Sequence, residues 1–153
     1  MQLHFAKESP DIADRALAFA INKHADQLDK AGEAYVSHAI RVADCVGDHP
    51  TLRAVAYLHD VVEDTDTSIE DIRREFGYAV ADIIDKLTRR KNESYENYIA
   101  RCSRSHRARV VKIADLVDNM NLYRLPVLTM KDAERQLKYA NALVVLMNKE
   151  CDG

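Results

Sequence analysis

The chain has 153 residues, of which 47% are hydrophobic and 31% are charged, and its formal net charge at pH 7 is -3. A chain of this length is expected to fold as one domain over residues 1–153 and to bury a core without disulfide support. Its longest apolar run, from Ala142 to Met147, is far shorter than the roughly 20 residues that a membrane-spanning helix needs, so we expect no membrane partner.

Scarce glycine and proline, with apolar residues three and four positions apart, predict helices along almost the whole chain. The first begins at a start signal of Ser9, Pro10 and Asp11. Helices are expected at about residues 12–24, 37–46, 51–63, 69–76, 78–89, 95–103, 105–123 and 131–149. No strand, internal repeat or low-complexity linker is apparent. The sequence therefore predicts a single all-α domain.

The amino-terminal residues and the cysteines favour a cytoplasmic protein. Polar and charged residues interrupt the apolar ones from His4 to Glu8, unlike the continuous apolar stretch of a secretory signal. The three cysteines contain no Cys-x-x-Cys pair, which argues against a disulfide framework or a zinc knuckle. We expect reduced thiols and a cytoplasmic location.

The third predicted helix carries the densest set of polar groups at its carboxyl end. His59 and Glu63 are four positions apart, as are Asp60 and Asp64, so each pair shares a face of the helix. The rest of this helix is apolar around nearly its whole circumference, which indicates a central helix where ionisable groups are costly to bury unless a metal or partner compensates. Imidazole with carboxylate ligation suits manganese, iron or zinc. A polar helix end facing water is the alternative.

Two other segments hold further candidates. Asp115 and Asn119 lie one turn apart in another apolar helix, so Asp115 is a candidate metal ligand and Asn119 would point at whatever the metal binds. An ion pair with Lys112 is the alternative for Asp115. His38, at the beginning of a predicted helix, could project into a central cavity or cap the helix at the surface.

Together these segments resemble a known family. The order Tyr-Val-Ser-His (35–38), Leu-His-Asp-Val-Val-Glu-Asp-Thr (58–65), Phe-Gly (76–77), Leu-Thr (87–88) and Val-Lys-Ile-Ala-Asp-Leu-Val-Asp-Asn (111–119) is similar to the HD-domain hydrolases of the RelA/SpoT group, of the small stand-alone alarmone hydrolase type. The resemblance covers about residues 12–140. It implies an all-helical HD fold with a central manganese site, and the implied ligands are His38, His59, Asp60 and Asp115.

The resemblance also implies a reaction, because family members remove a ribose 3′-pyrophosphate from guanosine tetra- and pentaphosphate. A manganese-dependent hydrolase of this kind, acting on a guanosine or adenosine alarmone, is therefore the expected function. Carried over by position, the catalytic residues are Glu63 and Asp64, and the substrate-binding residues are Lys30, Asn119, Arg135 and Tyr139. The alternatives are an HD phosphatase of another nucleotide phosphate and a non-catalytic nucleotide sensor. The expected partner is a small-molecule nucleotide and not a nucleic acid, while the oligomeric state stays open.

One departure from the family leaves base specificity open. In many members an arginine that stacks on the guanine base precedes the loop lysine, whereas here Asp29 precedes Lys30. A carboxylate cannot stack as a cation on a purine and would repel a nearby diphosphate unless it turns away.

Charge is distributed unevenly along the chain. Residues 86–112 include nine basic side chains and two acidic ones, a local charge of +7. Such a stretch is either a solvated face or an electrostatic guide for a polyanionic ligand.

Overall fold

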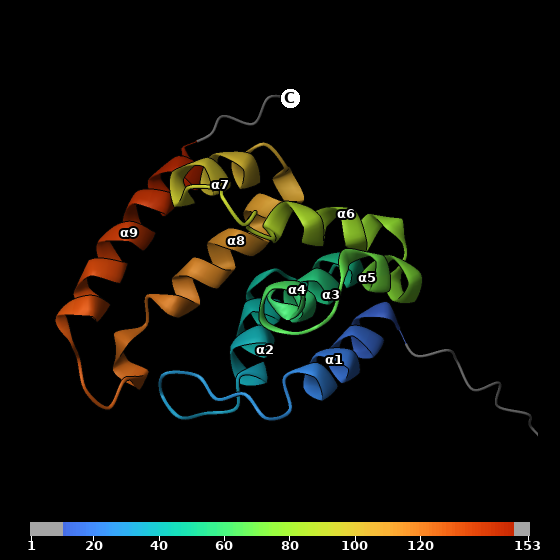
Figure 1. The fold of residues 1–153 in the computed structure, drawn as a ribbon, viewed down its shortest axis with the longest axis horizontal. Helices are drawn as coiled ribbons and strands as arrows, with labels where there is room; N and C mark the ends of the chain where they lie inside the picture. The colour runs from blue at the N-terminus through green and yellow to red at the C-terminus, as the bar shows by residue number, and fades with distance from the viewer. Residues whose placement is uncertain (1–10, 149–153) are drawn as a thin grey trace, which may run out of the picture.

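The structure, a computed structural model, describes residues 11–148 of the chain (Figure 1). Within them lie nine α-helices, one short 3-10 helix and no strand, although Leu28 and Ala34 form an isolated antiparallel bridge. The elements are α1 (Ile12–Lys23), α2 (Val36–Cys45), α3 (Pro50–Leu58), α4 (Val61–Asp64), α5 (Ile69–Phe76), α6 (Tyr78–Leu87), α7 (Tyr95–Ser103), α8 (His106–Asn119), η1 (Leu122–Arg124) and α9 (Met130–Met147). The all-α expectation is confirmed. The start signal at Ser9 and Pro10 lies outside the described residues.

The helix expected at 51–63 is interrupted, and the interruption falls at the polar residues. Helix α3 ends at Leu58 and α4 begins at Val61, with His59 and Asp60 between them. Asp60 has φ -106° and ψ -1°, in the bridge region of backbone space. Because the residues on both sides keep the apolar character of a continuous helix, the sequence pattern does not reveal this break.

The helix expected at 105–123 is also shorter than predicted. Helix α8 ends at Asn119, and residues 122–124 form η1 after a bend at Asn121, whose side-chain oxygen accepts the N–H of Tyr123. The chain then passes Pro126 and begins α9 at Met130. This early ending turns the segment after α8 back towards the loop that precedes α2, where it lines a pocket.

Helix α3 lies at the centre of the core. It packs against α1, α2, α6 and α8. Residues 54–56 and Leu58 are fully buried. Alanines on the facing sides of α1 and α3, among them Ala16, Ala20 and Ala54, allow a close approach of the two helices. The carboxyl end of α3 is thereby held in the middle of the molecule.

Helix α8 links this core to the outer pair of α7 and α9, because it contacts α2, α3 and α6 as well as both outer helices (Figure 1). Helix α9 starts with a capping box in which Thr129 and Asp132 exchange side-chain and backbone hydrogen bonds. Among the described residues, no helix combines the length and apolarity needed to cross a membrane.

Leu58→Ala should lower the free energy of unfolding by about 2–5 kcal/mol, because the fully buried side chain leaves a cavity at the centre of the core. Leu128→Ala is the matched control, since Leu128 is 60% exposed, and it should change stability by about 0.5 kcal/mol or less. Urea unfolding followed by circular dichroism gives both values. Equal losses in the two variants would contradict a core centred on α3.

Candidate functional site

Four side chains from three parts of the fold meet in one cluster. His38 comes from α2, His59 and Asp60 from the break between α3 and α4, and Asp115 from α8. Each offers one ligand atom, and these atoms all lie within 4.8 Å of one another. His38 Nε2 is 3.0 Å from Asp115 Oδ1, and His59 Nε2 is 3.0 Å from Asp60 Oδ2. The structure thus brings together the four residues expected to bind a metal.

Hydrogen bonds on the far side of each ring orient the two imidazoles. His59 Nδ1 donates to the carbonyl of Ala56 at 2.7 Å, and His38 Nδ1 donates to Asp118 at 2.7 Å. A neutral ring that donates from Nδ1 presents the lone pair of Nε2. The two Nε2 atoms face each other at 3.3 Å. Two lone pairs at this separation, next to two carboxylates, form a donor set that fits a divalent cation.

The electrostatics of the cluster also favour positive charge at its centre. Burial opposes the charged form of His59, but Asp60 and Asp115 beside it raise its pKa well above the usual value. Burial acts against ionisation of Asp115 too, yet Lys112 and the two imidazoles hold its pKa well below the usual value. A bound metal would take over this positive charge by displacing protons from the rings.

Asp115 satisfies both interpretations of its role. One carboxylate oxygen, Oδ2, pairs with Lys112 Nζ at 2.7 Å. The other oxygen, Oδ1, faces the imidazoles and accepts a hydrogen bond from Asn119 Nδ2 at 2.9 Å. The ion pair with Lys112 therefore orients Asp115 towards the cluster and does not remove it.

Residues that support the cluster were missed by reasoning from the sequence. Asp118 accepts hydrogen bonds from His38, from Arg41 at 2.8 Å and from Arg124 at 3.2 Å. The hydroxyl of Tyr35 donates to Asp60. Asp118 follows Asp115 by three residues, and Tyr35 precedes His38 by three residues, within the quoted motifs. This spacing was the one sequence signal that could have indicated their supporting roles. Apart from Arg124, which is six residues from Asp118, their partners are 25 to 80 residues away in the chain and become neighbours only in the fold.

His24, which directly follows α1, packs against Tyr35. It is buried, its Nδ1 is 2.8 Å from Gln27 Oε1, and its ring packs against that of Tyr35 with centroids 4.9 Å apart. This is a structural role.

Glu63 and Asp64 lie on α4, directly after the cluster, and both are exposed. Glu63 Oε1 accepts the backbone N–H of Arg89 at 2.6 Å. Although both residues reach the surface, the protein atoms around each carboxyl desolvate it, and this desolvation together with the charge of Asp60 raises the pKa of each carboxyl. The structure therefore places beside the cluster two carboxyl groups whose pKa values are shifted towards neutrality.

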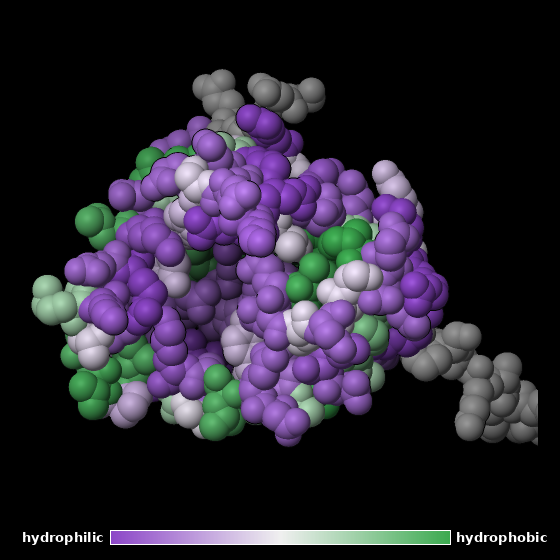
Figure 2. Space-filling model, viewed as in Figure 1, coloured by the Kyte–Doolittle hydropathy of each residue, from purple (hydrophilic) through white to green (hydrophobic). Residues whose placement is uncertain are grey.

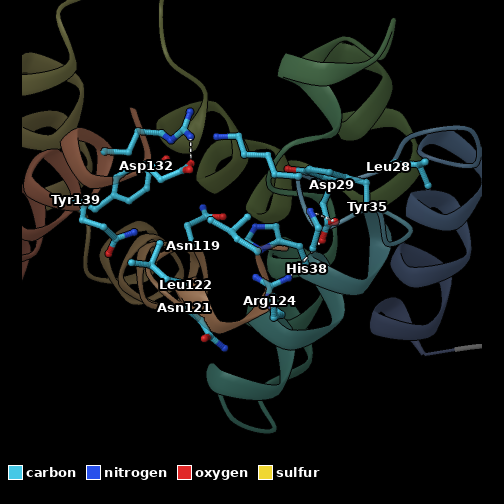
Figure 3. Close-up of a pocket in the computed structure, with 15 residues that line it drawn as sticks. Leu28, Asp29, Tyr35, His38, Asn119, Asn121, Leu122, Arg124, Asp132 and Tyr139 are labelled. Atoms are coloured by element: carbon cyan, nitrogen blue, oxygen red, sulfur yellow. Dashed lines mark hydrogen bonds and ion pairs between the residues drawn. The ribbon is translucent and has the colours of Figure 1, made fainter. Parts of the chain in front are cut away.

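A pocket of about 280 Å³ opens next to the cluster (Figure 3). All four predicted substrate-binding residues, Lys30, Asn119, Arg135 and Tyr139, line it. The rest of the lining consists of Leu28, Asp29, Ala31, Tyr35, His38, Asn121, Leu122, Arg124, Leu125, Asp132 and Gln136. His38 and Asn119 lie between the loop before α2 on one side and α9 on the other. Figure 2 shows a hollow bordered by hydrophilic residues on this face of the molecule.

Two cations of this pocket are suited to an anionic ligand. Lys30 makes no hydrogen bond or ion pair within residues 11–148, and burial and the charge of Arg135 lower its pKa. Arg135 pairs with Asp132, which is itself engaged in the capping box of α9. The mutual repulsion of Lys30 and Arg135 would be relieved by a negatively charged group between them.

Contacts within its own loop and with Arg124 hold the carboxylate of Asp29. Its Oδ1 accepts the backbone N–H groups of Ala31 at 2.9 Å and Glu33 at 3.0 Å, and its Oδ2 pairs with Arg124 at 3.3 Å. The carboxylate therefore shapes the loop, and its charge is matched by a guanidinium from η1.

The basic stretch at 86–112 is partly neutralised. Ion pairs join four of its nine basic residues to carboxylates within or beside the stretch: Lys86 to Asp82, Arg90 to Asp85, Arg101 to Glu93 and Lys112 to Asp115. Of these four, Lys112 does not belong to a solvated face, because it is directed at Asp115 of the cluster.

Comparison with known proteins places these observations in a wider context. A family model described as HD domain matches residues 16–140. The chain is 36% identical over 129 residues to a guanosine-3′,5′-bis(diphosphate) 3′-pyrophosphohydrolase of Aquifex aeolicus, covering 76% of this chain and 18% of that protein. It is 35% identical over 136 residues to the Drosophila melanogaster guanosine-3′,5′-bis(diphosphate) 3′-pyrophosphohydrolase MESH1, covering 80% and 75%.

A solved structure of a metazoan orthologue of SpoT that hydrolyses ppGpp superimposes with a TM-score of 0.79 at 27% identity, covering 96% of this chain and 92% of that one. The chain spans only 14–18% of the length of the first five curated relatives that it matches. Some of these long relatives carry the name GTP pyrophosphokinase.

Asp118→Asn should weaken binding of a divalent cation about tenfold, because the neutral amide is a poorer acceptor for the His38 ring and cannot balance Arg41 and Arg124. Titration calorimetry of the metal-free protein with Mn²⁺ measures the change. Asp66→Asn, at a side chain that is 90% exposed, should bind as the unmodified protein does. Unchanged affinity in Asp118→Asn would mean that the outer hydrogen bond does not orient His38.

Proposed function

Because the chain belongs to the HD domain family, we propose that it is a manganese-dependent hydrolase that removes the 3′-pyrophosphate from a guanosine 3′,5′-bis(diphosphate) type of nucleotide. One observation carries the proposal: a cation-lined pocket opens directly onto His38, at the edge of the four-residue cluster. The names of its relatives agree with this assignment, including one of which the chain covers 75%.

His38, His59, Asp60 and Asp115 would hold the metal ion. Two imidazole nitrogens and two carboxylate oxygens suit Mn²⁺, and their outer hydrogen bonds leave the ligand atoms directed inwards. When bound, the ion supplies a Lewis acid that neutralises charge on phosphate oxygens and makes water more acidic.

The side chains of the pocket would position the nucleotide. Lys30 and Arg135 would provide positive charge for phosphate oxygens, and Asn119, which donates to Asp115 of the cluster and lines the pocket, would contact the ribose. The ring of Tyr139 forms a wall on which the nucleotide can pack. Since Asp29 is held in its loop by Arg124, it leaves the pocket without a stacking cation at that position, so an adenine nucleotide is a second candidate substrate.

Glu63 and Asp64 would handle the protons of the reaction. In the hydrolysis, a water oxygen forms a bond to phosphorus, the bond from phosphorus to the ribose 3′ oxygen breaks, and the leaving oxygen takes up a proton. Glu63, whose carboxylate accepts the N–H of Arg89, and Asp64, beside it on α4, would accept the proton of the water and supply that of the leaving group. Their raised pKa values suit both tasks.

The function is tested by incubating the manganese-loaded protein with guanosine and adenosine 3′-pyrophosphate nucleotides and resolving the products. Release of intact pyrophosphate is expected. Release of orthophosphate would instead indicate a phosphatase, and binding without turnover would indicate a nucleotide sensor. His59→Ala should lose bound manganese and activity together, whereas His49→Ala, at an exposed histidine outside the cluster, should keep both. Full turnover by His59→Ala would refute the proposed ligand set.

Glu63→Gln should lower kcat about 10²- to 10⁴-fold with little change in KM, because it removes a proton-transfer group and keeps the shape of the side chain. Steady-state kinetics with saturating Mn²⁺ measure both constants. Glu70→Gln, at an exposed residue of α5, is the control and should match the unmodified protein. A Glu63→Gln protein that loses affinity but retains kcat would assign Glu63 to binding.

A further inference from the structure

Helix α9 exposes large apolar side chains on the face directed away from the pocket. Met130, Leu137, Val144 and Met147 are 78%, 66%, 60% and 67% exposed. In Figure 2, hydrophobic residues appear along the edge of the molecule that α9 occupies in Figure 1. The packing of α9 on α7 and α8 therefore does not account for these residues.

The exposed residues repeat regularly over the whole helix. Met130, Ala133, Leu137, Ala140, Val144 and Met147 are separated by alternate steps of three and four residues, and we call this set the α9 seam. Such spacing is the pattern by which one helix packs along another in a coiled coil. The two alanines alternate with large residues, so the seam has both ridges and gaps.

We propose that the α9 seam binds the α9 seam of a second copy of this chain, with the two helices antiparallel about a two-fold axis. In that arrangement Leu137 faces Ala140 of the second copy, Val144 faces Ala133, and Met130 faces Met147. Each alanine thus meets a large side chain, and the two-fold axis makes every such contact twice. A parallel pair would place alanine against alanine and leave gaps.

The exposed area is of the size that a dimer needs. Val127 and Leu128, which precede α9 in the chain, and Val145, which follows Val144 on it, are also 71%, 60% and 47% exposed. With the four large seam residues they offer on the order of 400 Å² of apolar surface. A standard interface buries about 800 Å² per partner, roughly 60% of it apolar. A patch of this size also equals the largest that a typical monomer leaves exposed.

The surroundings of the seam fit the same arrangement. Glu134 and Asn141 flank it on one side, and in the antiparallel pair Glu134 of one copy lies beside Asn141 of the other, whose amide can donate to the carboxylate. A second cavity, of about 330 Å³ between α7 and α9, is lined by Leu137, Val145 and Ile99 among others. This cavity forms a groove next to the large side chains of the α9 seam. A second copy of the chain would therefore add polar contacts beside the seam to the apolar contacts along it.

Sedimentation equilibrium over a range of protein concentrations tests the proposal. The unmodified chain should show twice its 17.4 kDa mass at micromolar concentration. Leu137→Glu should sediment as a monomer there, because it buries a carboxylate against an alanine. Ile21→Glu, at a 48% exposed residue of α1, should remain a dimer. Circular dichroism shows whether each variant is folded. A monomeric unmodified chain, or a folded Leu137→Glu protein that still dimerises, would overturn the proposal.

A second pair of variants tests the orientation of the helices. Ala140→Leu should weaken the antiparallel dimer at least tenfold, because leucine would then meet leucine at two places. Adding Leu137→Ala should restore the dimer, since a small residue again faces a large one. In a parallel pair Ala140→Leu would fill a gap and strengthen association, which would refute the antiparallel arrangement. None of these measurements depends on turnover. Their outcome therefore tests the dimer independently of the proposed function.

Discussion

The need to balance buried charge dominates this structure. Two imidazoles and two carboxylates lie within a few ångströms of one another at the centre of a helical core, where each would be costly alone. The cost is reduced by hydrogen bonds that reach outwards from every member of the cluster: to a carbonyl, to a second carboxylate, to a tyrosine hydroxyl and to a lysine. The remaining inward-facing atoms form a set that suits a cation.

The fold supplies what this balance requires. Close packing of small residues between α1 and α3 places the end of α3 in the middle of the molecule, and the break after Leu58 directs His59 and Asp60 towards α8. Helix α8 bears Asp115 on the same face as Asn119, so one helix contributes both to the cluster and to the pocket. Helix α9 completes the pocket with Arg135 and Tyr139 on its inner face.

Much of this could be predicted from the sequence, and the remainder shows where local patterns stop being informative. The helical periodicity indicated the fold class, and the His-Asp dipeptide with Asp115 and His38 indicated the cluster. The break at His59 was not foreseeable, because the apolar pattern continues across it. The roles of Asp118 and Arg124 depend on contacts between residues 77 to 95 positions apart, which no spacing rule encodes.

The loop before α2 is joined to the cluster by a chain of charges. Asp29 pairs with Arg124, Arg124 pairs with Asp118, and Asp118 holds the ring of His38. The residue at position 29 is thus connected by three contacts to a proposed metal ligand. An arginine at that position would confront Arg124 with a like charge, so a sequence that changed residue 29 alone would disturb His38 as well. Positions 29 and 124 are therefore expected to change together when such a pocket diverges, because residue 29 is coupled through Arg124 and Asp118 to His38.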